Sequence, residues 1–394
     1  MSTYKPKTNL FLRAWYDKET RSVIIQIIAA ALIMSFFAYL INNASINMAK
    51  LGKDIDFSFL SDPSSYDINQ TLIEYSSRSS HFRAGLAGLI NTLLIAGFGI
   101  VIATLLGFVL GVMRLSKNFI TQKLAYIYIE YMRNVPVLLH ILLLYGVILN
   151  VFPKTKQAFN FGDTFFLSNR GLMSPTGTFE SAILPVFFVL TAGVVFTFWF
   201  RSFAKRSQEK TGKTYPVALI SLTGLVLLPC LAYFLSDSPI SWEYPVLKGF
   251  NFKGGMVIRP EFMALLIALS LYTAAFIGEI VRGGILAIDY GQTEASSALG
   301  LSPQRTLSLV VIPQAMRVII PPLTSQYLNL AKNSSLAIAI GYMDIVATIG
   351  GISLNQTGRE METMTIVLSM YLVISLIISS VMNWYNKHIQ IVDR

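Results

Sequence analysis

Apolar runs long enough to cross a lipid bilayer recur along this chain and constrain its fold more than any other feature. The first run, residues 23–41, contains 19 residues, which as a helix matches the thickness of a membrane core. Unpaired backbone groups are not tolerated in lipid, so each run is predicted to be helical. We predict an all-α polytopic membrane protein with about eight transmembrane helices, near residues 23–41, 86–113, 125–152, 182–200, 216–235, 262–281, 307–340 and 363–384.

Composition and charge agree with a membrane protein. Charged residues make up 13% of the chain, against about 25% in soluble domains. The net charge of +10 does not indicate nucleic-acid binding, because the basic residues flank the apolar runs. Eight spans put both termini on one side, and lysine and arginine are denser there, which predicts cytoplasmic termini. A cleaved signal peptide is the alternative for the first run, but that run is longer than a usual signal core.

No set of residues points to catalysis or to a bound cofactor. The single cysteine, Cys230, excludes an intrachain disulfide, and the histidines His81, His140 and His388 have no metal-ligand spacing. Gly212-Lys213-Thr214 resembles the end of a phosphate-binding loop, but Ser207 stands where that motif needs glycine. We expect no enzyme activity, no metal and no ATP bound by this chain.

Charges within the spans are costly and therefore informative. Glu130 and Arg133 are three residues apart and can pair on one helical face, and the same holds for Glu279 and Arg282. Both pairs lie near span ends, so an anchoring role is favoured over substrate contact.

Small residues recur along the second span. The spacing Gly107-x-x-x-Gly111 lets another helix approach closely, although chance accounts for it equally well.

The run at 307–340 combines three prolines with polar side chains. Pro313, Pro321 and Pro322 are predicted to break the helix, and irregular backbone at membrane depth survives only beside protein or water. We interpret this segment as the candidate translocation path, with a pure packing role as the alternative. Its polar members are Arg317, Gln326, Lys332, Asn333, Ser334 and Ser335.

A polar stretch at 294–313 separates two spans and predicts two short helices. Thr293 is expected to cap the first helix, with Glu294 in its first turn, and Gly300 to end it in the left-handed conformation. Ser302 is expected to cap the second helix, with Pro303 in its first turn. Pro313 is expected to bend the chain.

This stretch resembles the EAA loop of ABC importer permeases. Glu294-Ala295-Ser296, then Gly300, then Val310-Val-Ile-Pro313 follow that pattern, with mild departures at Ser296, Val310 and Ile312. In that family the loop docks on the ATPase subunit. The resemblance implies the same coupling role here for Glu294, Ala295, Ser296, Gly300, Leu301, Pro303 and Pro313.

The flanking spans resemble permeases of polar amino acids. The matching stretches are 131–139, 275–285, Pro321-Pro322-Leu323 and 330–336, where Asn333 replaces the usual aspartate. The resemblance covers 84–152 and 262–386 and implies a five-span, MetI-like permease core. The second part of that core is 262–394. Two segments are additions to it: an N-terminal span with an external loop (1–83) and a two-span insertion with external loops (153–261). This layout resembles the Q-type permeases of general L-amino-acid transporters.

The resemblance implies an ATP-driven importer of L-amino acids in a bacterial inner membrane. Its expected partners are a second related permease, an ATP-binding cassette ATPase dimer that uses the ATP, and a periplasmic amino-acid-binding protein. An ion-coupled secondary amino-acid transporter is the first alternative, and a membrane sensor or scaffold without transport is the second.

Overall fold

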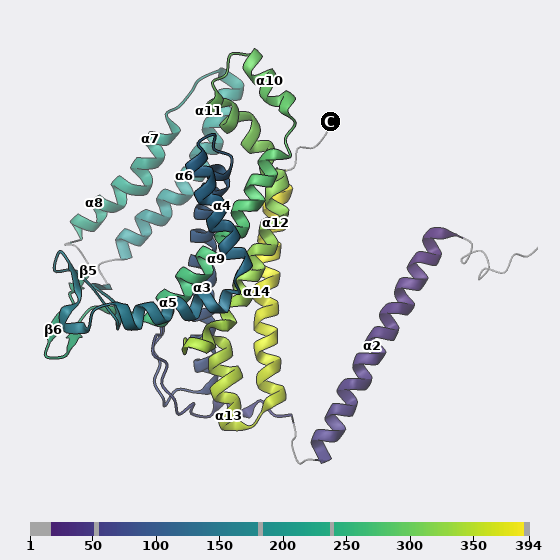
Figure 1. Ribbon diagram of the computed structural model, residues 1–394, viewed down its shortest axis with the longest axis vertical. Helices are drawn as coiled ribbons and strands as arrows, with labels where there is room; N and C mark the ends of the chain where they lie inside the picture. The colour runs from purple at the N-terminus through teal and green to yellow at the C-terminus, as the bar shows by residue number, and fades with distance from the viewer. Residues whose placement is uncertain (1–16, 51–54, 180–183, 237–239, 390–394) are drawn as a thin grey trace, which may run out of the picture.

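The computed structural model describes residues 17–50, 55–179, 184–236 and 240–389, and most of them are helical. Among these residues, seven helices are long and apolar enough to cross a membrane, or eight if one bent pair counts as a span, which confirms the predicted number (Figure 1). The straight candidates are α2 (Lys18–Lys50), α3 (His81–Arg114), α6 (Leu184–Thr211), the helical run Val217–Leu235, α9 (Pro260–Leu286), the run Pro303–Ile340 and α14 (Glu360–Ile389).

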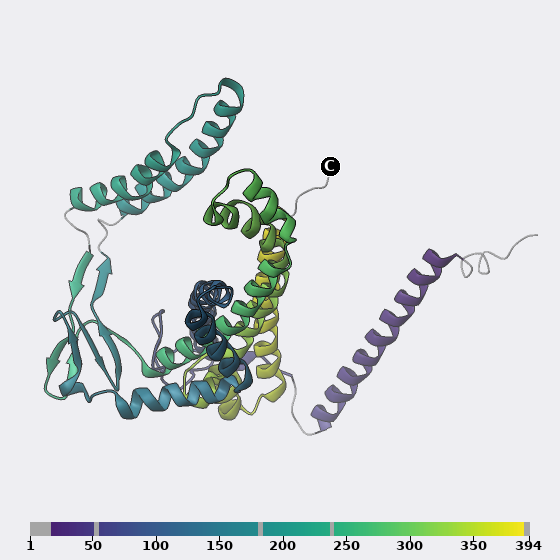
Figure 2. The same ribbon diagram turned by 45° about the horizontal axis from the view of Figure 1, so that its top comes forward.

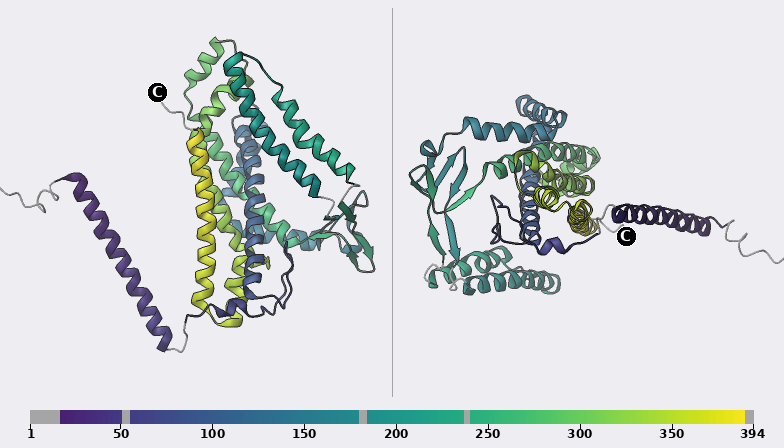
Figure 3. Two further views of the ribbon diagram at one scale, coloured as in Figure 1. Left: turned by 180° about the vertical axis from the view of Figure 1, so that it is seen from behind. Right: turned by 90° about the horizontal axis from the view of Figure 1, so that it is seen from below.

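The first span, α2, stands apart from the remaining helices (Figures 1 and 3). Among its described side chains only Ile24 and Ala44 are even partly covered. The helix is longer than the run 23–41 that predicted it, because polar ends extend an apolar centre.

The core forms where α3 packs along α9. Glycines of α3 allow this approach: a Cβ on Gly107 would lie 2.5 Å from Ile277, and one on Gly111 would lie 2.6 Å from Val281. The packing role considered for these two glycines is therefore confirmed. Buried Ile95, Ile141, Leu265, Leu269, Ile319 and Leu330 fill the space around this contact.

The predicted third span, 125–152, is made of two helices that meet at a sharp bend. Two helices, α4 (Phe119–Asn134) and α5 (Val137–Val151), meet at a bend of 105°. The reason is Pro136: it holds Val135 in an extended conformation (φ −105°, ψ 132°) and itself begins α5. Helix α5 consequently lies across the bundle and packs on α9.

The two spans of the insertion form a hairpin beside the core (Figure 2). Helix α6 packs against α7 (Val217–Leu222), a π-helical turn η4 (Thr223–Leu227) and α8 (Leu228–Leu235). Gly193 and Gly224 make this close contact, since a Cβ on Gly193 would lie 2.3 Å from the carbonyl oxygen of Gly224. The π-helical turn η4 comes just before Pro229, which has no N–H and so disturbs the regular helix.

Short strands replace the loops that were expected on either side of this hairpin. One sheet has the order β1-β2-β3-β8, built from Phe159–Phe161, Phe165–Ser168, Gly171–Ser174 and Met256–Ile258. Two further ribbons pair β4 (Thr176–Phe179) with β5 (Ile240–Glu243) and β6 (Val246–Lys248) with β7 (Asn251–Lys253). We call residues 153–179 and 240–259 together the sheet region. All of its strands lie at the end of the molecule opposite α10 (Tyr290–Ala298) (Figure 1).

The C-terminal half completes the core. Helix α12 (Ile312–Asn333) continues into a 3-10 segment η6 (Ser334–Ile340), and a π-helical segment η7 (Val346–Ser353) with the short α13 (Leu354–Thr357) leads to α14. The predicted break at Pro321 and Pro322 is wrong, because α12 passes through both prolines. Beyond the two prolines, the backbone stays α-helical as far as Asn333 and becomes a 3-10 helix at Ser334.

Candidate functional site: a coupling surface and a polar helix face

The helix α10 projects beyond the bundle at one end of the molecule (Figures 1 and 2). It begins earlier than predicted, because Asp289 and not Thr293 is its cap. The Asp289 Oδ1 atom accepts a hydrogen bond from the N–H of Gly291 at 2.7 Å. Glu294 therefore lies in the middle of α10, exposed, and not in its first turn.

The end of α10 matches the prediction made for Gly300. This residue has φ +74°, a conformation that glycine adopts without steric cost. The N–H of Gly300 bonds to the Ser297 carbonyl at 2.9 Å, and the N–H of Leu301 bonds to the Ser296 carbonyl at 3.1 Å. This pair of bonds is a Schellman motif, which fixes the direction of the chain after the helix.

The second helix is not a separate short element. Ser302 and Pro303 start α11 (Pro303–Thr306), although the Ser302 side chain makes no capping bond. The chain then stays helical through the π-helical segment η5 (Leu307–Val311) into α12, so that Pro303–Ile340 forms one run of 38 residues. Pro313 follows a widened turn and does not break the helix.

Large apolar side chains are exposed on this helix pair, which we call the coupling surface (residues 289–313). Leu299 is 82% exposed, Tyr290 73% and Leu309 65%. A groove of about 830 Å³ separates α10 from the start of the long helix, and Thr293, Ser297 and Leu307 are among its lining residues. Exposed apolar groups beside polar ones are typical of a protein docking site.

The coupling surface is joined to the core through α12. Ser296 is buried, and its hydroxyl donates to the Gln292 carbonyl at 2.7 Å. The Gln314 amide in α12 donates to the Gln292 side chain at 3.2 Å. This bond and the continuous helical run from Pro303 connect α10 to α12.

The predicted path residues are not brought together at one point. Arg317 and Lys332 are separated by about 22 Å along α12 at 1.5 Å per residue. Gln326 lies on about the opposite face from Arg317, since nine residues turn a helix by about 180°. Ser334 is buried, and its hydroxyl donates to the Ala331 carbonyl at 2.8 Å. Ser335 donates likewise to the carbonyl of Lys332 at 2.7 Å.

One face of α12 is both polar and exposed. Pro322, Ser325, Asn329 and Lys332 follow one another at intervals of three or four residues, and all four are exposed. Pro321 and Pro322 also leave the carbonyls of Arg317 and Val318 without their usual N–H donors. Such groups do not face lipid, so this face must meet protein or water. Sequence reasoning missed Ser325, although the spacing of the four residues could have found it.

Arg317 lies between these two regions. Its side chain is half-buried, and within the described parts of the chain its Nε atom has no hydrogen-bond partner. No ion pair of Lys332 is found there either.

The two predicted intramembrane pairs behave differently. Arg282 donates through Nε to Glu279 Oε1 at 2.8 Å, as the spacing allowed. Glu130 instead accepts from the Asn134 amide at 3.2 Å, while the Arg133 guanidinium lies 5.6 Å from the ring centre of Phe276. The predicted pairing is therefore right for Glu279 and Arg282 and wrong for Glu130 and Arg133.

A buried carboxylate beside the polar face was not singled out from the sequence. Asp344 is fully buried and accepts from the N–H of Ala347 at 2.9 Å and from the hydroxyl of Tyr371 at 3.2 Å. Tyr371 also contacts the Ser334 hydroxyl at 3.4 Å, so this network ties η6 to η7 and α14. The only signal was a lone aspartate in the apolar stretch 336–352.

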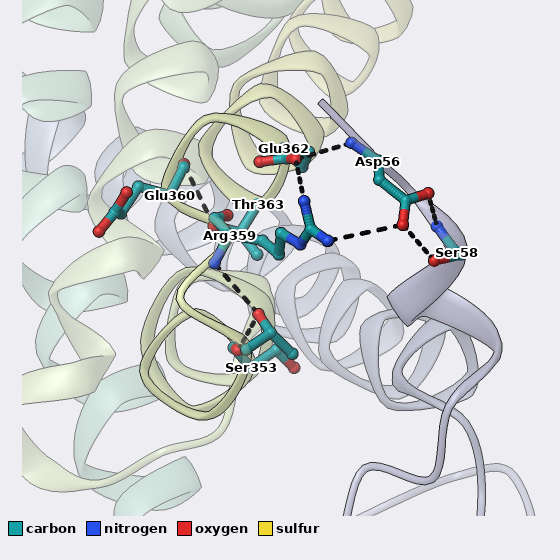
Figure 4. A network of polar contacts seen from close by, with 8 residues as sticks. Asp56, Ser58, Ser353, Arg359, Glu360, Glu362 and Thr363 are labelled. Atoms are coloured by element: carbon teal, nitrogen blue, oxygen red, sulfur yellow. Dashed lines mark hydrogen bonds and ion pairs between the residues drawn. The ribbon is translucent and has the colours of Figure 1, made fainter. Parts of the chain in front are cut away.

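A second network of polar contacts (Figure 4) lies near α13, at the end of the bundle opposite α10 (Figure 1). Glu362, 1% exposed, accepts from the backbone N–H of Asp56 at 2.9 Å and lies 3.5 Å from Arg359. Arg359 also reaches Asp56 at 3.6 Å. Hydrogen bonds from Ser58, helped by Arg359, hold the pKa of Asp56 below its usual value. These contacts fasten the segment 55–61 to the start of α14.

Within the described residues, no group of three or more histidine, cysteine, aspartate or glutamate side chains has the arrangement of a metal site.

Comparison with known proteins identifies the family. Residues 212–391 match the family described as binding-protein-dependent transport system inner membrane component. The general L-amino acid transport system permease protein AapQ of Rhizobium johnstonii is 42% identical over 98% of this chain and 96% of its own length. The putative amino-acid ABC transporter permease protein YhdX of Escherichia coli is 44% identical over 98% and 96%.

The glutamate/glutamine/aspartate/asparagine transport system permease protein BztB of Rhodobacter capsulatus is 44% identical over 96% of both chains. These alignments include the first span and the insertion as well as the core. They confirm the resemblance drawn from the motifs and give no support to an ion-coupled transporter. The chain belongs to the permease subunits of amino-acid ABC transporters.

Proposed function

We propose that this chain forms one half of the import path for L-amino acids and that an ATPase dimer drives it by docking on the coupling surface. The observation that carries this proposal is the rigid link from α10 to α12. The Schellman motif at Gly300 and the unbroken helix from Pro303 connect an exposed apolar surface to the polar face of α12. Closure of the ATPase dimer would thus tilt α12 without unfolding it. ATP is bound by the ATPase and not by this chain.

A second, related permease completes the path by packing beside the exposed face of α12. That face carries Asn329 and Lys332, which need protein or water as neighbours. The Lys332 ammonium is suited to the carboxylate of an amino acid that passes between the two subunits. The relatives named above transport amino acids, which supports the same substrate class here.

The coupling surface lies on the cytoplasmic side in this proposal, as do both termini, in a bacterial inner membrane. Strongly basic residues at the same end support this orientation: Lys205, Arg206, Lys210 and Lys213 lie at and after the end of α6. The sheet region then faces the periplasm, where a substrate-binding protein delivers the amino acid.

Replacing Gly300 with valine tests the coupling role of α10. We expect Gly300→Val to lower uptake and ATPase stimulation at least about tenfold, because a β-branched residue resists positive φ and redirects the chain after α10. Both activities are measured in proteoliposomes that contain the assembled transporter.

Gly212→Val is the matched control. Gly212 also has positive φ (+72°) and open space around its α-carbon, and it lies at the same end of the molecule but outside the coupling surface. Equal activity of the two variants, with equal amounts of assembled complex, would show that the turn at Gly300 has no coupling role.

A further inference from the structure

A basic pocket opens in the sheet region, next to the end of α5. Its volume is about 490 Å³, and its lining includes Lys154, Lys156, Arg170 and Phe250. Among its lining residues there is no carboxylate. All of its lining residues belong to the sheet region, which lies away from α10 and the coupling surface (Figure 1).

Three separate segments hold the basic groups in place. The N–H of Asn169 donates to the Pro153 carbonyl at 2.9 Å, which brings the turn before β3 against the chain that leaves α5. The Arg170 guanidinium donates to the Asn251 side chain. The Lys156 ammonium lies 4.0 Å from the centre of the Phe250 ring, a cation–π contact.

Charge selects an anionic ligand for this pocket. The sheet region carries six lysine and arginine residues against two acidic ones, Asp163 and Glu243. Ammonium and guanidinium groups bind carboxylates through charge-assisted hydrogen bonds. A carboxylate is therefore the ligand class that the pocket fits.

The openness of the pocket favours a carboxylate on a protein over a free small molecule. Lys154, Lys156 and Arg170 are all exposed, and Phe250 is 78% exposed, whereas small-molecule sites enclose most of the ligand. Exposed Phe159, Phe161, Trp242 and Tyr244 are further aromatic residues of the sheet region. Aromatic residues with arginine are enriched at protein interfaces.

The bilayer is the less favoured occupant. Open strand edges such as that of β1 leave backbone groups unpaired, so the sheets must stand outside the hydrocarbon layer. The sheet region is also attached to the core: β8 leads directly into α9, and the Tyr145 hydroxyl of α5 donates to Glu261 of α9 at 3.2 Å. A protein bound at the pocket would therefore lie close to the ends of α5 and α9.

We propose that the basic pocket receives acidic side chains of the periplasmic amino-acid-binding protein and so docks it on this subunit. This inference rests on the proposed function and adds the surface at which the binding protein is recognised. The attraction brings the two proteins together at the outer ends of α5 and α9.

The test uses the complete transporter in nanodiscs with its binding protein and substrate. The measured quantity is the concentration of binding protein that half-maximally stimulates ATP hydrolysis. For Lys154→Glu combined with Lys156→Glu we expect this concentration to rise at least about tenfold, with the maximal rate kept and the salt dependence weakened. Lys248→Glu, which changes an exposed lysine of β6 outside the pocket, is the matched control and should behave as wild type.

An unchanged half-maximal concentration in the double variant would overturn the docking role while leaving the proposed function intact. Absence of any stimulation in the wild-type complex would remove the proposed function and this inference with it. The measurement is repeated in nanodiscs made only of zwitterionic lipid. A difference between variant and wild type that vanishes there would identify anionic lipid as the ligand and overturn the inference.

Discussion

At the residue scale, Gly88 in α3 sets how closely η7 can approach. A Cβ at this position would lie 2.2 Å from the Thr348 hydroxyl and 2.8 Å from the Asp344 carbonyl oxygen. We expect Gly88→Ala to lower the free energy of unfolding by about 1–3 kcal/mol, as overpacking does. Thermal unfolding of the purified protein in detergent measures this loss.

Gly97→Ala provides the comparison for that change. Gly97 lies on the same helix, but a Cβ there meets nothing within 4 Å. Its replacement should leave Tm unchanged or raise it slightly, since alanine favours helix over glycine by about 1 kcal/mol. If Gly88→Ala were as stable as Gly97→Ala, close contact between α3 and η7 would not be needed.

Lys332 is the second residue whose role can be measured. On the proposed path its positive charge attracts the substrate carboxylate, so Lys332→Gln should lower uptake at least about tenfold with the complex still assembled. Lys332→Arg keeps the charge and should retain much of the uptake. Lys205→Gln, on the exposed end of α6, controls for loss of a lysine in general. Wild-type uptake by Lys332→Gln would exclude the charge from the path.

At the element scale, the junction between segment 55–61 and α14 responds to acid. The pKa of Asp56 is lowered in the folded protein, chiefly by hydrogen bonds from Ser58. The ionised carboxylate therefore stabilises the fold above the ordinary aspartate pKa of about 3.9, and this contribution is lost as pH falls through the lowered value.

We expect the Tm of the wild type to fall more steeply below about pH 4 than that of Asp56→Asn, which has no charge to lose. Asp163→Asn is the control: Asp163 is an exposed aspartate of the sheet region, away from this junction. Parallel Tm curves for wild type and Asp56→Asn would show that the ionised carboxylate, with its bonds from Ser58 and its contact with Arg359, adds no stability.

The positions of the helices could be predicted from the sequence, because a bilayer demands long apolar runs. The bends within the helices could not. The bend at Pro136 depends on one residue in an otherwise apolar stretch, and Pro321 and Pro322 look like breaks although α12 absorbs both. The carbonyls freed in α12 lie toward an exposed face, where protein or water can satisfy them. Local sequence does not reveal that environment.

At the scale of the whole molecule, the turn at the end of α10 was predictable from its motif, and the sheet region was not. Gly300 ends α10 as its type and position required. The strands are three or four residues long, too short for an alternating pattern to be recognised, and they pair segments on opposite sides of a helical hairpin. Asp344 and Glu362 were missed because their partners come from distant parts of the chain.

The exposed polar face of α12 has a consequence for how the cell supplies this subunit. A copy inserted into the membrane alone would hold Asn329 and Lys332 against acyl chains, at a cost of several kcal/mol. On the proposed arrangement with a second permease, the amount of assembled transporter would therefore follow whichever half is synthesised more slowly.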